Sequence, residues 1–205
     1  KSEEKIVGGK NGFGVKLIFI WSTYGCIETI DHTRGLKYTQ EFKNNLDEIC
    51  KPSIRKCKTK PYTKIEFKPD YKRLGIDGLS PDVLALLKRR VYDIAAVTPK
   101  TIKVKWNSTI VPVKHFQQFA DYSIGTKGDV KRIYECANGR WEYVVCVSPS
   151  GEFQHISFVN GIYTSNGGKH VDYILNQIVR KMVAMIKKKK HIDVKPNTIK
   201  EQIML

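Results

Sequence analysis

Residues 153–190 read FQHISFVNGIYTSNGGKHVDYILNQIVRKMVAMIKKKK and carry the clearest structural pattern in the chain. Residues 153–159 predict a strand, the glycine-containing residues 160–169 predict a loop, and a long helix is predicted from about His170. Offsets of three and four residues place the apolar side chains of this helix on one stripe: Val171, Ile174, Leu175, Ile178, Val179, Met182, Val183 and Ile186. We expect this stripe to pack against a sheet.

The residues before this stretch supply the strands for that sheet. Residues 130–135, 141–147 and 153–159 predict three consecutive strands, with turn residues between them at Asn138-Gly139 and Ser150-Gly151. A short hairpin is expected around Asn107, and a short helix over residues 115–122. We expect a sheet of about four strands against the long helix.

The first half of the chain predicts a helix, three strands and a second helix. Residues 15–21 predict a buried helix. A first strand is expected at residues 26–30, a turn at 33–36 leads to a second strand that ends at Phe42, and a third strand is expected at residues 62–67. Residues 44–61 are lysine-rich and unpatterned, so we expect a loop. Ser80-Pro81-Asp82 predicts the start of a helix that runs to about residue 96, and Pro99 suggests a domain boundary nearby.

Composition narrows the classes of function. The chain has 205 residues and a formal net charge of +16, with 41% hydrophobic residues. This apolar content argues against disorder, no run is long enough to span a bilayer, and residues 1–5 do not suggest a secretory leader. Five cysteines without a Cys-x-x-Cys pair favour a reducing, intracellular compartment over a disulfide framework or a zinc site. The charge favours a polyanionic partner, with solvated lysines as the alternative.

A glycine-rich loop before the first helix is the sharpest local motif. Its glycines leave backbone N–H groups unobstructed at a helix N-terminus, which is a geometry that binds phosphate. Val15 occupies the position that needs lysine in a Walker A loop, and no apolar strand precedes the loop as a dinucleotide fingerprint requires. A tight structural turn is the alternative. The candidate nucleotide-binding residues are Gly9, Lys10, Asn11, Gly12, Phe13, Gly14, Val15 and Lys16.

A lysine run follows the apolar stripe of the long helix. Residues 180–200 contain eight basic residues and one acidic residue, Asp193. Lysines that fan around a helix end can contact DNA phosphates without reading bases. A favourable charge at the helix C-terminus and a nuclear localisation patch are the alternatives. The candidate DNA-binding residues are Lys187, Lys188 and Lys189.

The loop at residues 160–170 is a third candidate. Thr164, Ser165, Gly167 and Gly168 suit either a nucleic-acid groove or a simple turn, and His170 suits a capping or packing role. We find no Ser/His/Asp grouping and no paired carboxylates. The other histidines lack ligand spacing, so the sequence predicts no metal site in this chain.

Four blocks together resemble the eukaryotic-type DNA topoisomerase II family, a type IIA enzyme. GGKNGFGVKL at residues 8–17 is similar to its glycine-rich ATP-binding block, and RRVYDIA at residues 89–95 to the helix that closes its ATPase domain. FQHISFVNG at residues 153–161 and TSNGGKHVDY at residues 164–173 are similar to a transducer strand and the loop and helix start after it. The order and spacing agree along essentially the whole chain.

The resemblance implies an α+β fold in two domains. Residues 1–98 would be the C-terminal part of a GHKL (Bergerat) ATPase domain, a mixed sheet with helices. Residues 99–205 would be an incomplete transducer domain, with a ribosomal-protein-like βαβ fold and one long helix. The family needs ATP and Mg²⁺, acts on double-stranded DNA as a homodimer closed through the ATPase gate, and passes one duplex through another. The glycine loop would wrap the triphosphate, and Lys187, Lys188 and Lys189 fall where the family has a DNA-contacting lysine triplet.

The same resemblance limits what this chain holds. The family's general base and magnesium-binding asparagine would precede it, while the switch lysine and nucleophilic tyrosine would follow, so no catalytic or metal-binding residue is expected here. Lys10 and Phe13 replace the more usual arginine and tyrosine. We expect a fragment that cannot hydrolyse ATP unaided. We also expect no membrane partner, and location in the nucleus or in a viral replication compartment.

Two other functions stay open from the sequence. One is a different GHKL ATPase, for instance one that resembles mismatch-repair proteins, which would share the loop but would not relax supercoils. The other is a non-enzymatic basic nucleic-acid-binding module whose glycines are structural. Nucleotide binding would distinguish a GHKL ATPase from a nucleic-acid-binding module. Relaxation of supercoiled DNA would distinguish a topoisomerase from another GHKL ATPase.

Overall fold

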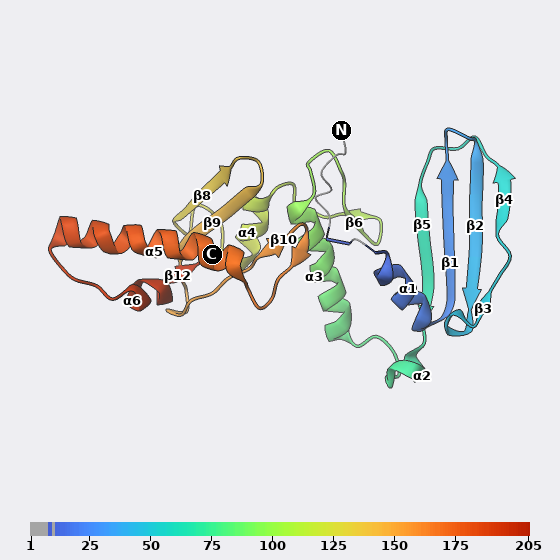
Figure 1. Ribbon diagram of the computed structural model, residues 1–205, viewed down its shortest axis with the longest axis horizontal. Coiled ribbons are helices and arrows are strands. Elements are labelled where there is room, and N and C mark those ends of the chain that lie inside the picture. Colours follow the sequence, from blue (N-terminus) through green and yellow to red (C-terminus); the bar gives the residue numbers. More distant parts are fainter. Residues whose placement is uncertain (1–7, 10) are drawn as a thin grey trace. The chain divides into compact units, whose positions relative to one another are not determined.

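The computed structural model describes residues 8, 9 and 11–205, which form two compact units (Figure 1). The first unit is Gly9–Val83, and the second contains residues 84–205 together with Gly8. The division falls within one helix, α3 (Pro81–Val97). The assignment of residues 1–98 and 99–205 to two functional domains is a separate matter and stays a prediction.

The first unit is an antiparallel sheet with one helix packed on it. Helix α1 (Phe13–Ile20) leads into β1 (Ser22–Asp31), β2 (Leu36–Lys43) and, later, β5 (Thr63–Pro69). The strand order is β3-β2-β1-β5, with β3 (Glu48–Ile49) and β4 (Ser53–Lys56) both paired to β2. A 3-10 turn, η1 (Asn44–Leu46), joins β2 to β3, and a short helix, α2 (Tyr71–Leu74), follows β5. The helix and the three expected strands are therefore confirmed.

The expected loop at residues 44–61 is wrong. The chain makes a 3-10 turn and two strands there, with register pairs such as Lys37↔Arg55 and Thr39↔Ser53 on β2. Both strands are exposed along their whole length. An exposed edge strand needs no alternation of apolar and polar residues, so backbone pairing forms it without leaving a pattern in the sequence.

Helix α1 is also less buried than expected, because Phe19 is its only buried residue in the described chain. The register places Gly25, Ile27, Phe42, Ile65 and Phe67 on the sheet face that Phe19 contacts. Ile65 and Phe67 are still 42% and 46% exposed, so α1 covers only part of this apolar face.

The second unit contains the long helix and a small sheet. After α3 come a hairpin of β6 (Lys105–Trp106) and β7 (Thr109–Ile110), helix α4 (Phe116–Ile124), β8 (Arg132–Ala137) and β9 (Trp141–Val147). The hairpin of β10 (Phe158–Val159) and β11 (Ile162–Tyr163) then leads to α5 (Lys169–Lys190). Helix α6 (Pro196–Glu201) and β12 (Ile203–Met204) complete the described chain. The predicted long helix, the short helix, the hairpin around Asn107 and the strands at residues 130–135 and 141–147 are confirmed.

The stretch expected as a strand at residues 153–159 joins the sheet through β12 and not through β9. Gln154 forms a parallel bridge with Met204, and the Ile156 N–H donates a 2.9 Å hydrogen bond to the Leu205 carbonyl; the last two residues form β10, which pairs with β11. The sheet of the second unit has the strand order β12-β9-β8, with Ile203↔Val147 and Met204↔Cys146 in register, and the bridge at Gln154 adds a short fourth row. The residue pattern at 153–159 correctly predicts an extended conformation, but a local pattern does not determine which strand this segment pairs with.

Several helices of this unit bury apolar side chains. The stripe on α5 buries Val171, Leu175 and Val179, and α6 and β12 add Ile199 and Ile203 to the same cluster. Helix α4 packs Ala120 and Ile124 against Val144 of β9. No helix in the described part of the chain combines the length and apolar character that crossing a bilayer requires.

Candidate nucleotide and DNA sites

The candidate phosphate loop lies at the N-terminus of α1. Gly12 is the N-cap in a left-handed conformation, with φ 68° and ψ 12°, and the helix begins at Phe13, inside the predicted motif. No side chain caps the helix and no acidic residue lies in its first turn. The N–H groups of Phe13, Gly14 and Val15 therefore have neither an intrahelical acceptor nor a competing carboxylate.

The glycines of this loop have two different explanations. Gly12 needs its positive φ, so a structural turn accounts for it. Gly9 and Gly14 lie outside the left-handed region, and a Cβ built on either meets no described atom within 4 Å. Within residues 8, 9 and 11–205, neither backbone strain nor packing requires glycine at these two positions. The open space beside exposed N–H groups is what the close approach of a phosphate needs.

The other predicted residues of the loop lie at or near the N-terminus of α1. Asn11 and Phe13 are exposed, and Lys16 Nζ lies 5.8 Å from the centre of the Phe13 ring, which keeps a positive charge within the first turns. Val15 is half-buried. Lys10, the remaining predicted residue, lies outside the described residues.

Helix α1 is fixed to the sheet at its other end. The Phe19 ring stacks on Phe42 with centroids 4.9 Å apart, and a Cβ on Gly25 would come within 2.5 Å of Phe19 Cδ1. Arg73 Nη1 and Asn45 Nδ2 donate hydrogen bonds of 2.9 and 3.0 Å to the Ile20 carbonyl. A cation at the helix C-terminus also complements the helix dipole. These contacts attach the C-terminal end of α1 to the first unit, while no side chain caps its N-terminus.

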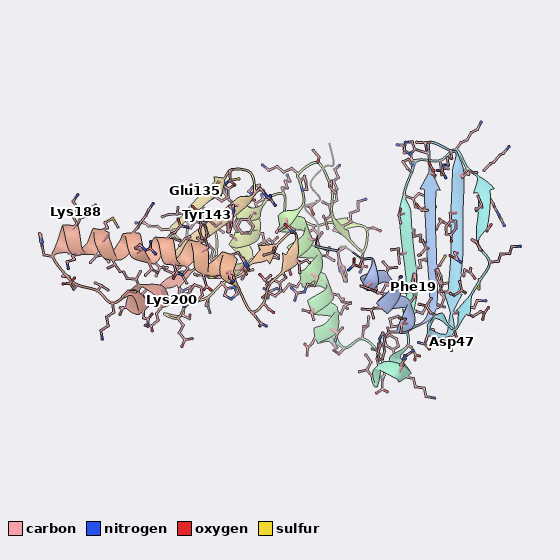
Figure 2. All side chains as sticks on the ribbon, in the orientation of Figure 1. Phe19, Asp47, Glu135, Tyr143, Lys188 and Lys200 are labelled. Atoms are coloured by element: carbon pink, nitrogen blue, oxygen red, sulfur yellow. The ribbon has the colours of Figure 1, made fainter. Side chains whose placement is uncertain are left out.

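The lysine run occupies the last turn of α5. Lys187, Lys188, Lys189 and Lys190 are all exposed, and Figure 2 shows Lys188 at the end of the helix. Lys187 Nζ lies 2.8 Å from Asp193 Oδ1, and both side chains are more than half exposed. His191 caps the helix in a left-handed conformation. Within the described chain, Lys188 and Lys189 form no ion pair, so a favourable dipole interaction and contact with an anion are both compatible with their position.

The turn at residues 160–170 brings together side chains that the sequence reasoning did not connect. Ser157 Oγ lies 2.7 Å from Thr164 Oγ1 and 3.3 Å from His155 Nδ1, and Thr164 Oγ1 lies 3.1 Å from His170 Nε2. No ion pair links a carboxylate to either histidine in the described chain. A sequence signal existed, since strand pairing of residues 157–159 with 162–164 places position 157 opposite 164.

This cluster fixes the start of α5. Gly167 has φ 70°, and a Cβ there would lie 3.1 Å from His155 Nε2, while one on Gly168 would lie 3.2 Å from His170 Nδ1. The packed glycines and the hydrogen bonds give the turn a structural role. Ser165 is exposed beside it.

Helix α3 contacts the same turn from the other side. The Arg90 guanidinium lies 4.3 Å from the centre of the Tyr163 ring, and its Nη1 donates a 2.7 Å hydrogen bond to Asp93 Oδ2. Asp93 is buried, with 4% of its surface exposed. Because a buried carboxylate is costly without a partner, this ion pair within α3 stabilises Asp93. The ring contact of Arg90 with Tyr163 joins α3 to the β10–β11 hairpin.

Acidic and sulfur side chains suggest no metal centre. Among residues 8, 9 and 11–205, no three His, Cys, Asp or Glu side chains gather as a metal site would require. All five cysteines are free thiols. Burial raises the pKa of the Cys146 thiol, so this cysteine is protonated and unreactive at neutral pH.

Comparison with known proteins assigns the family. The sequence model of the DNA gyrase B family matches residues 99–205, slightly more than half of the chain. The chain belongs to the DNA gyrase B family. The chain is 43% identical over 209 residues to DNA topoisomerase 2 of Arabidopsis thaliana. The aligned region covers 98% of the chain and 14% of that relative. The chain is 41% identical to DNA topoisomerase 2 of Acanthamoeba polyphaga mimivirus, covering 100% of the chain and 16% of that relative.

The fold is shared with a solved structure. The crystal structure of the ATPase region of Saccharomyces cerevisiae topoisomerase II superposes with a TM-score of 0.88 at 39% identity, covering 98% of this chain and 52% of that one. These similarities confirm the predicted resemblance and the predicted α+β class, and the named strands of the described chain pair in antiparallel fashion. The chain spans about a seventh of the length of its curated relatives, so it corresponds to one part of such proteins.

Proposed function

We propose that this chain is part of an ATP-dependent type IIA DNA topoisomerase, in which it binds the phosphates of ATP and relays the nucleotide state toward the DNA. Membership of the gyrase B family and the similarity to topoisomerase 2 proteins support the class of enzyme. The observation that carries phosphate binding is the open, acid-free N-terminus of α1, beside two glycines that neither packing nor backbone strain requires.

The geometry of α1 fits a triphosphate. Backbone N–H groups of Phe13, Gly14 and Val15 would donate to phosphate oxygens, the helix dipole would favour their negative charge, and Lys16 would add a cation. Gly9, Lys10, Asn11 and Gly12 would complete the wrap around the phosphates. ATP supplies the free energy of the cycle. The described residues contain no ligand cluster for Mg²⁺, so we assign no metal ligand to this chain.

The relay would run through α3. Its N-terminal turn belongs to the first unit and the rest to the second, so the helix is continuous between the two. The Arg90 contact with Tyr163 would couple α3 to the β10–β11 hairpin that precedes α5, and the ion pair with Asp93 within α3 holds the Arg90 side chain. A change at the nucleotide loop would then pass along the chain to the second unit, in which the last turn of α5 carries Lys187, Lys188 and Lys189 for contact with duplex DNA. We propose that the longer protein closes as a homodimer through its ATPase gate.

The relatives come from eukaryotes and a large DNA virus. We therefore propose the nucleus, or a viral replication compartment, as the place of action. The hypothesis that this chain does not hydrolyse ATP unaided is tested by the turnover of the purified 205-residue protein. Magnesium-dependent turnover there would contradict it.

Relaxation of supercoiled DNA by the full-length protein tests the proposed function. We expect relaxation that requires ATP and is lost in the Gly14→Val variant, because the added side chain would occupy the space of a phosphate. Hydrolysis of ATP without relaxation would favour another GHKL ATPase. Neither activity in a folded protein would favour a basic nucleic-acid-binding module.

The lysine run has its own test in the same protein. Replacing Lys187, Lys188 and Lys189 by Ala is expected to weaken stimulation of ATP turnover by DNA. It should also lower the slope of log affinity against log salt by about two to three, because each phosphate contact contributes about 0.9. DNA stimulation and salt slope equal to those of the parent protein would leave the run as a solvated helix end.

A further inference from the structure

A second basic surface lies far from the lysine run in the sequence. Residues 51–60 contain five basic side chains and no acidic residue, and we call this segment the basic edge. Its cations are Lys51, Arg55, Lys56, Lys58 and Lys60, and all five are exposed. None of them forms an ion pair within the described part of the chain. Unpaired cations at this density create a positive potential that attracts polyanions.

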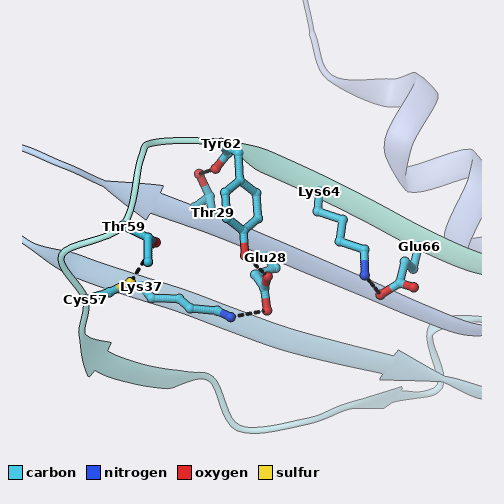
Figure 3. A network of polar contacts seen from close by, with 8 residues as sticks. All are labelled: Glu28, Thr29, Lys37, Cys57, Thr59, Tyr62, Lys64 and Glu66. Carbon is cyan, nitrogen blue, oxygen red and sulfur yellow. Dashed lines mark hydrogen bonds and ion pairs between the residues drawn. The ribbon is translucent and has the colours of Figure 1, made fainter. Parts of the chain in front are cut away.

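Neighbouring lysines on the same sheet behave differently. Lys37 Nζ lies 2.7 Å from Glu28 Oε2, and Lys64 Nζ lies 2.8 Å from Glu66 Oε2 (Figure 3). Lys43 also has an acidic neighbour, with its Nζ 3.6 Å from Glu48 Oε1. Lys37, Lys43 and Lys64 are therefore neutralised by carboxylates, whereas the cations of the basic edge have no ion-pair partner in the described chain.

The basic edge is held in place by the backbone. Its strand β4 pairs with β2 over four residues, from Leu36↔Lys56 to Thr39↔Ser53. After the strand, the Cys57 N–H donates a 2.8 Å hydrogen bond to the Gly35 carbonyl, and Cys57 Sγ lies 3.1 Å from Thr59 Oγ1. An edge fixed in this way loses little further backbone entropy when it binds a partner.

Two more contacts hold the far end of the segment. The Ile30 N–H donates a 3.0 Å hydrogen bond to the Tyr62 carbonyl, and the Tyr62 hydroxyl donates to Glu28 (Figure 3). The hydrogen bond to Glu28 raises the pKa of Tyr62, so its hydroxyl remains a donor at neutral pH. The cations are thus carried on an ordered frame.

We propose that the basic edge is a second contact surface for duplex DNA, which binds the phosphate backbone without reading bases. Arg55 and Lys56 end β4 and point to its opposite faces, while Lys51 precedes the strand and Lys58 and Lys60 follow it. The cations therefore follow one exposed edge of the sheet, where they can contact several phosphates of one duplex. The partner rests on the proposed function, in which duplex DNA is the substrate.

Duplex DNA fits the segment better than an acidic protein does. Protein interfaces are centred on aromatic or other large apolar anchors, and residues 51–60 contain no aromatic residue and one large apolar one, Ile54. The described chain also pairs β4 on one side only, with β2. Backbone N–H groups on its other side can add hydrogen bonds to phosphate oxygens.

The test measures binding of the 205-residue chain to a labelled duplex by fluorescence anisotropy at several salt concentrations. The edge variant replaces Lys51, Arg55, Lys56, Lys58 and Lys60 by Gln. A matched control replaces five exposed lysines of the second unit by Gln: Lys100, Lys103, Lys105, Lys127 and Lys131. Both variants lose the same net charge, so a difference between them reports the position of the charges.

We expect the edge variant to lower the salt slope by three or more and the matched control by no more than one. Equal slopes in the two variants would overturn the proposal. An edge variant with the DNA slope of the parent chain but weaker binding to poly-glutamate would assign the edge to an acidic protein, and would also overturn it.

Two further variants separate folding from binding. Lys51, Lys56, Lys58 and Lys60 replaced by Arg keep the charge, and the parent slope is expected. Replacement of Lys58 and Lys60 alone by Gln leaves the strand untouched and is expected to lower the slope by one or more, with an unchanged circular dichroism spectrum. An unchanged slope in this folded double variant would contradict the proposal.

The same data distinguish this inference from the proposed function. A parent chain that binds no duplex would contradict both. The parent chain could instead bind the duplex with a salt slope that falls when Lys187, Lys188 and Lys189 are replaced and stays unchanged in the edge variant. That result would contradict the role of the basic edge and leave the proposed function standing.

Discussion

Two helices in this protein begin after a glycine-rich turn, and the two turns serve different purposes. Before α1, Gly9 and Gly14 have open space where a side chain would be, and the first turn has no acidic residue. Before α5, Gly167 and Gly168 are packed against the rings of His155 and His170, and Asp172 lies in the first turn. The first helix start is free to bind an anion, whereas the second is filled by its own side chains.

The comparison shows what a glycine pattern means physically. In both turns the residues before the helix look alike in sequence, and neither helix has a side-chain cap. The difference lies in what surrounds the missing Cβ atoms, which depends on residues elsewhere in the chain. A glycine with no internal reason to be glycine indicates a partner from outside the chain.

The largest expected effect comes from removing the anchor of α1. Replacing Phe19 by Ala should lower the free energy of unfolding of the first unit by about 3–5 kcal/mol, because a buried ring leaves a cavity against Phe42 and Gly25. Urea unfolding of the 205-residue chain measures it. Leu17→Ala is the matched control on an exposed position of the same helix. Similar losses in the two variants would mean that Phe19 does not fix the helix.

A pair of glycine substitutions tests the comparison directly. Gly167→Ala is expected to lower the free energy of unfolding by about 1–3 kcal/mol, since φ is 70° and the new Cβ would meet His155. Gly14→Ala is expected to leave stability unchanged or raise it by up to about 1 kcal/mol, because Ala is the better helix former and finds open space. The same denaturation experiment compares them. A Gly14→Ala loss as large as that of Gly167→Ala would remove the argument that Gly14 serves a ligand.

A smaller effect concerns acid and the sheet beneath α1. The hydrogen bond from Lys37, followed by that from Tyr62, holds the pKa of Glu28 below its ordinary value of 4.5. Hydrogen bonds from Thr33 and Arg73 likewise lower the pKa values of Asp31 and Asp70. A lowered folded-state pKa stabilises the fold at neutral pH, and this stabilisation is lost as the pH falls below the ordinary value. In the described chain, every carboxylate with a resolved shift lies in the first unit.

As the pH falls, we therefore expect the amide protons of the first unit to lose their protection from hydrogen exchange before those of the second unit. Amide hydrogen exchange of the 205-residue chain between pH 6 and 3 would resolve the two units. Glu28→Gln is expected to reduce the pH dependence of the first unit slightly, because the Glu28–Lys37 pair is only half-buried and solvent screens it. Acid sensitivity confined to the second unit would contradict the expectation.

The sequence predicted most helices and strands because their patterns are local. The stripe on α5 and the Ser80 cap of α3, whose Oγ accepts from the Val83 N–H at 3.3 Å, are visible from residue spacing alone. The exposed strands β3 and β4 left no such pattern, and the strand beside β9 came from residues 203–204, while Gln154 pairs with the outer side of that strand. Pairing partners depend on the whole chain, which a local pattern does not contain.

The candidate sites divide in the same way. The glycine loop and the lysine run were predictable as charged or open backbone at helix ends, and both lie there in the fold. The contact of His155, Ser157, Thr164 and His170 was missed, because a β-hairpin brings these residues together from separate positions. The basic edge was visible only as composition until its strand pairing was known.

Binding of a non-hydrolysable ATP analogue by the full-length protein tests the central claim most directly. Isothermal titration calorimetry would compare the parent protein with Gly14→Val and with Gly167→Ala, which alters the packed turn. We predict that Gly14→Val weakens binding at least tenfold while the protein stays folded, and that Gly167→Ala changes affinity less than threefold. Equal affinity in the parent protein and Gly14→Val would contradict a phosphate site at the start of α1.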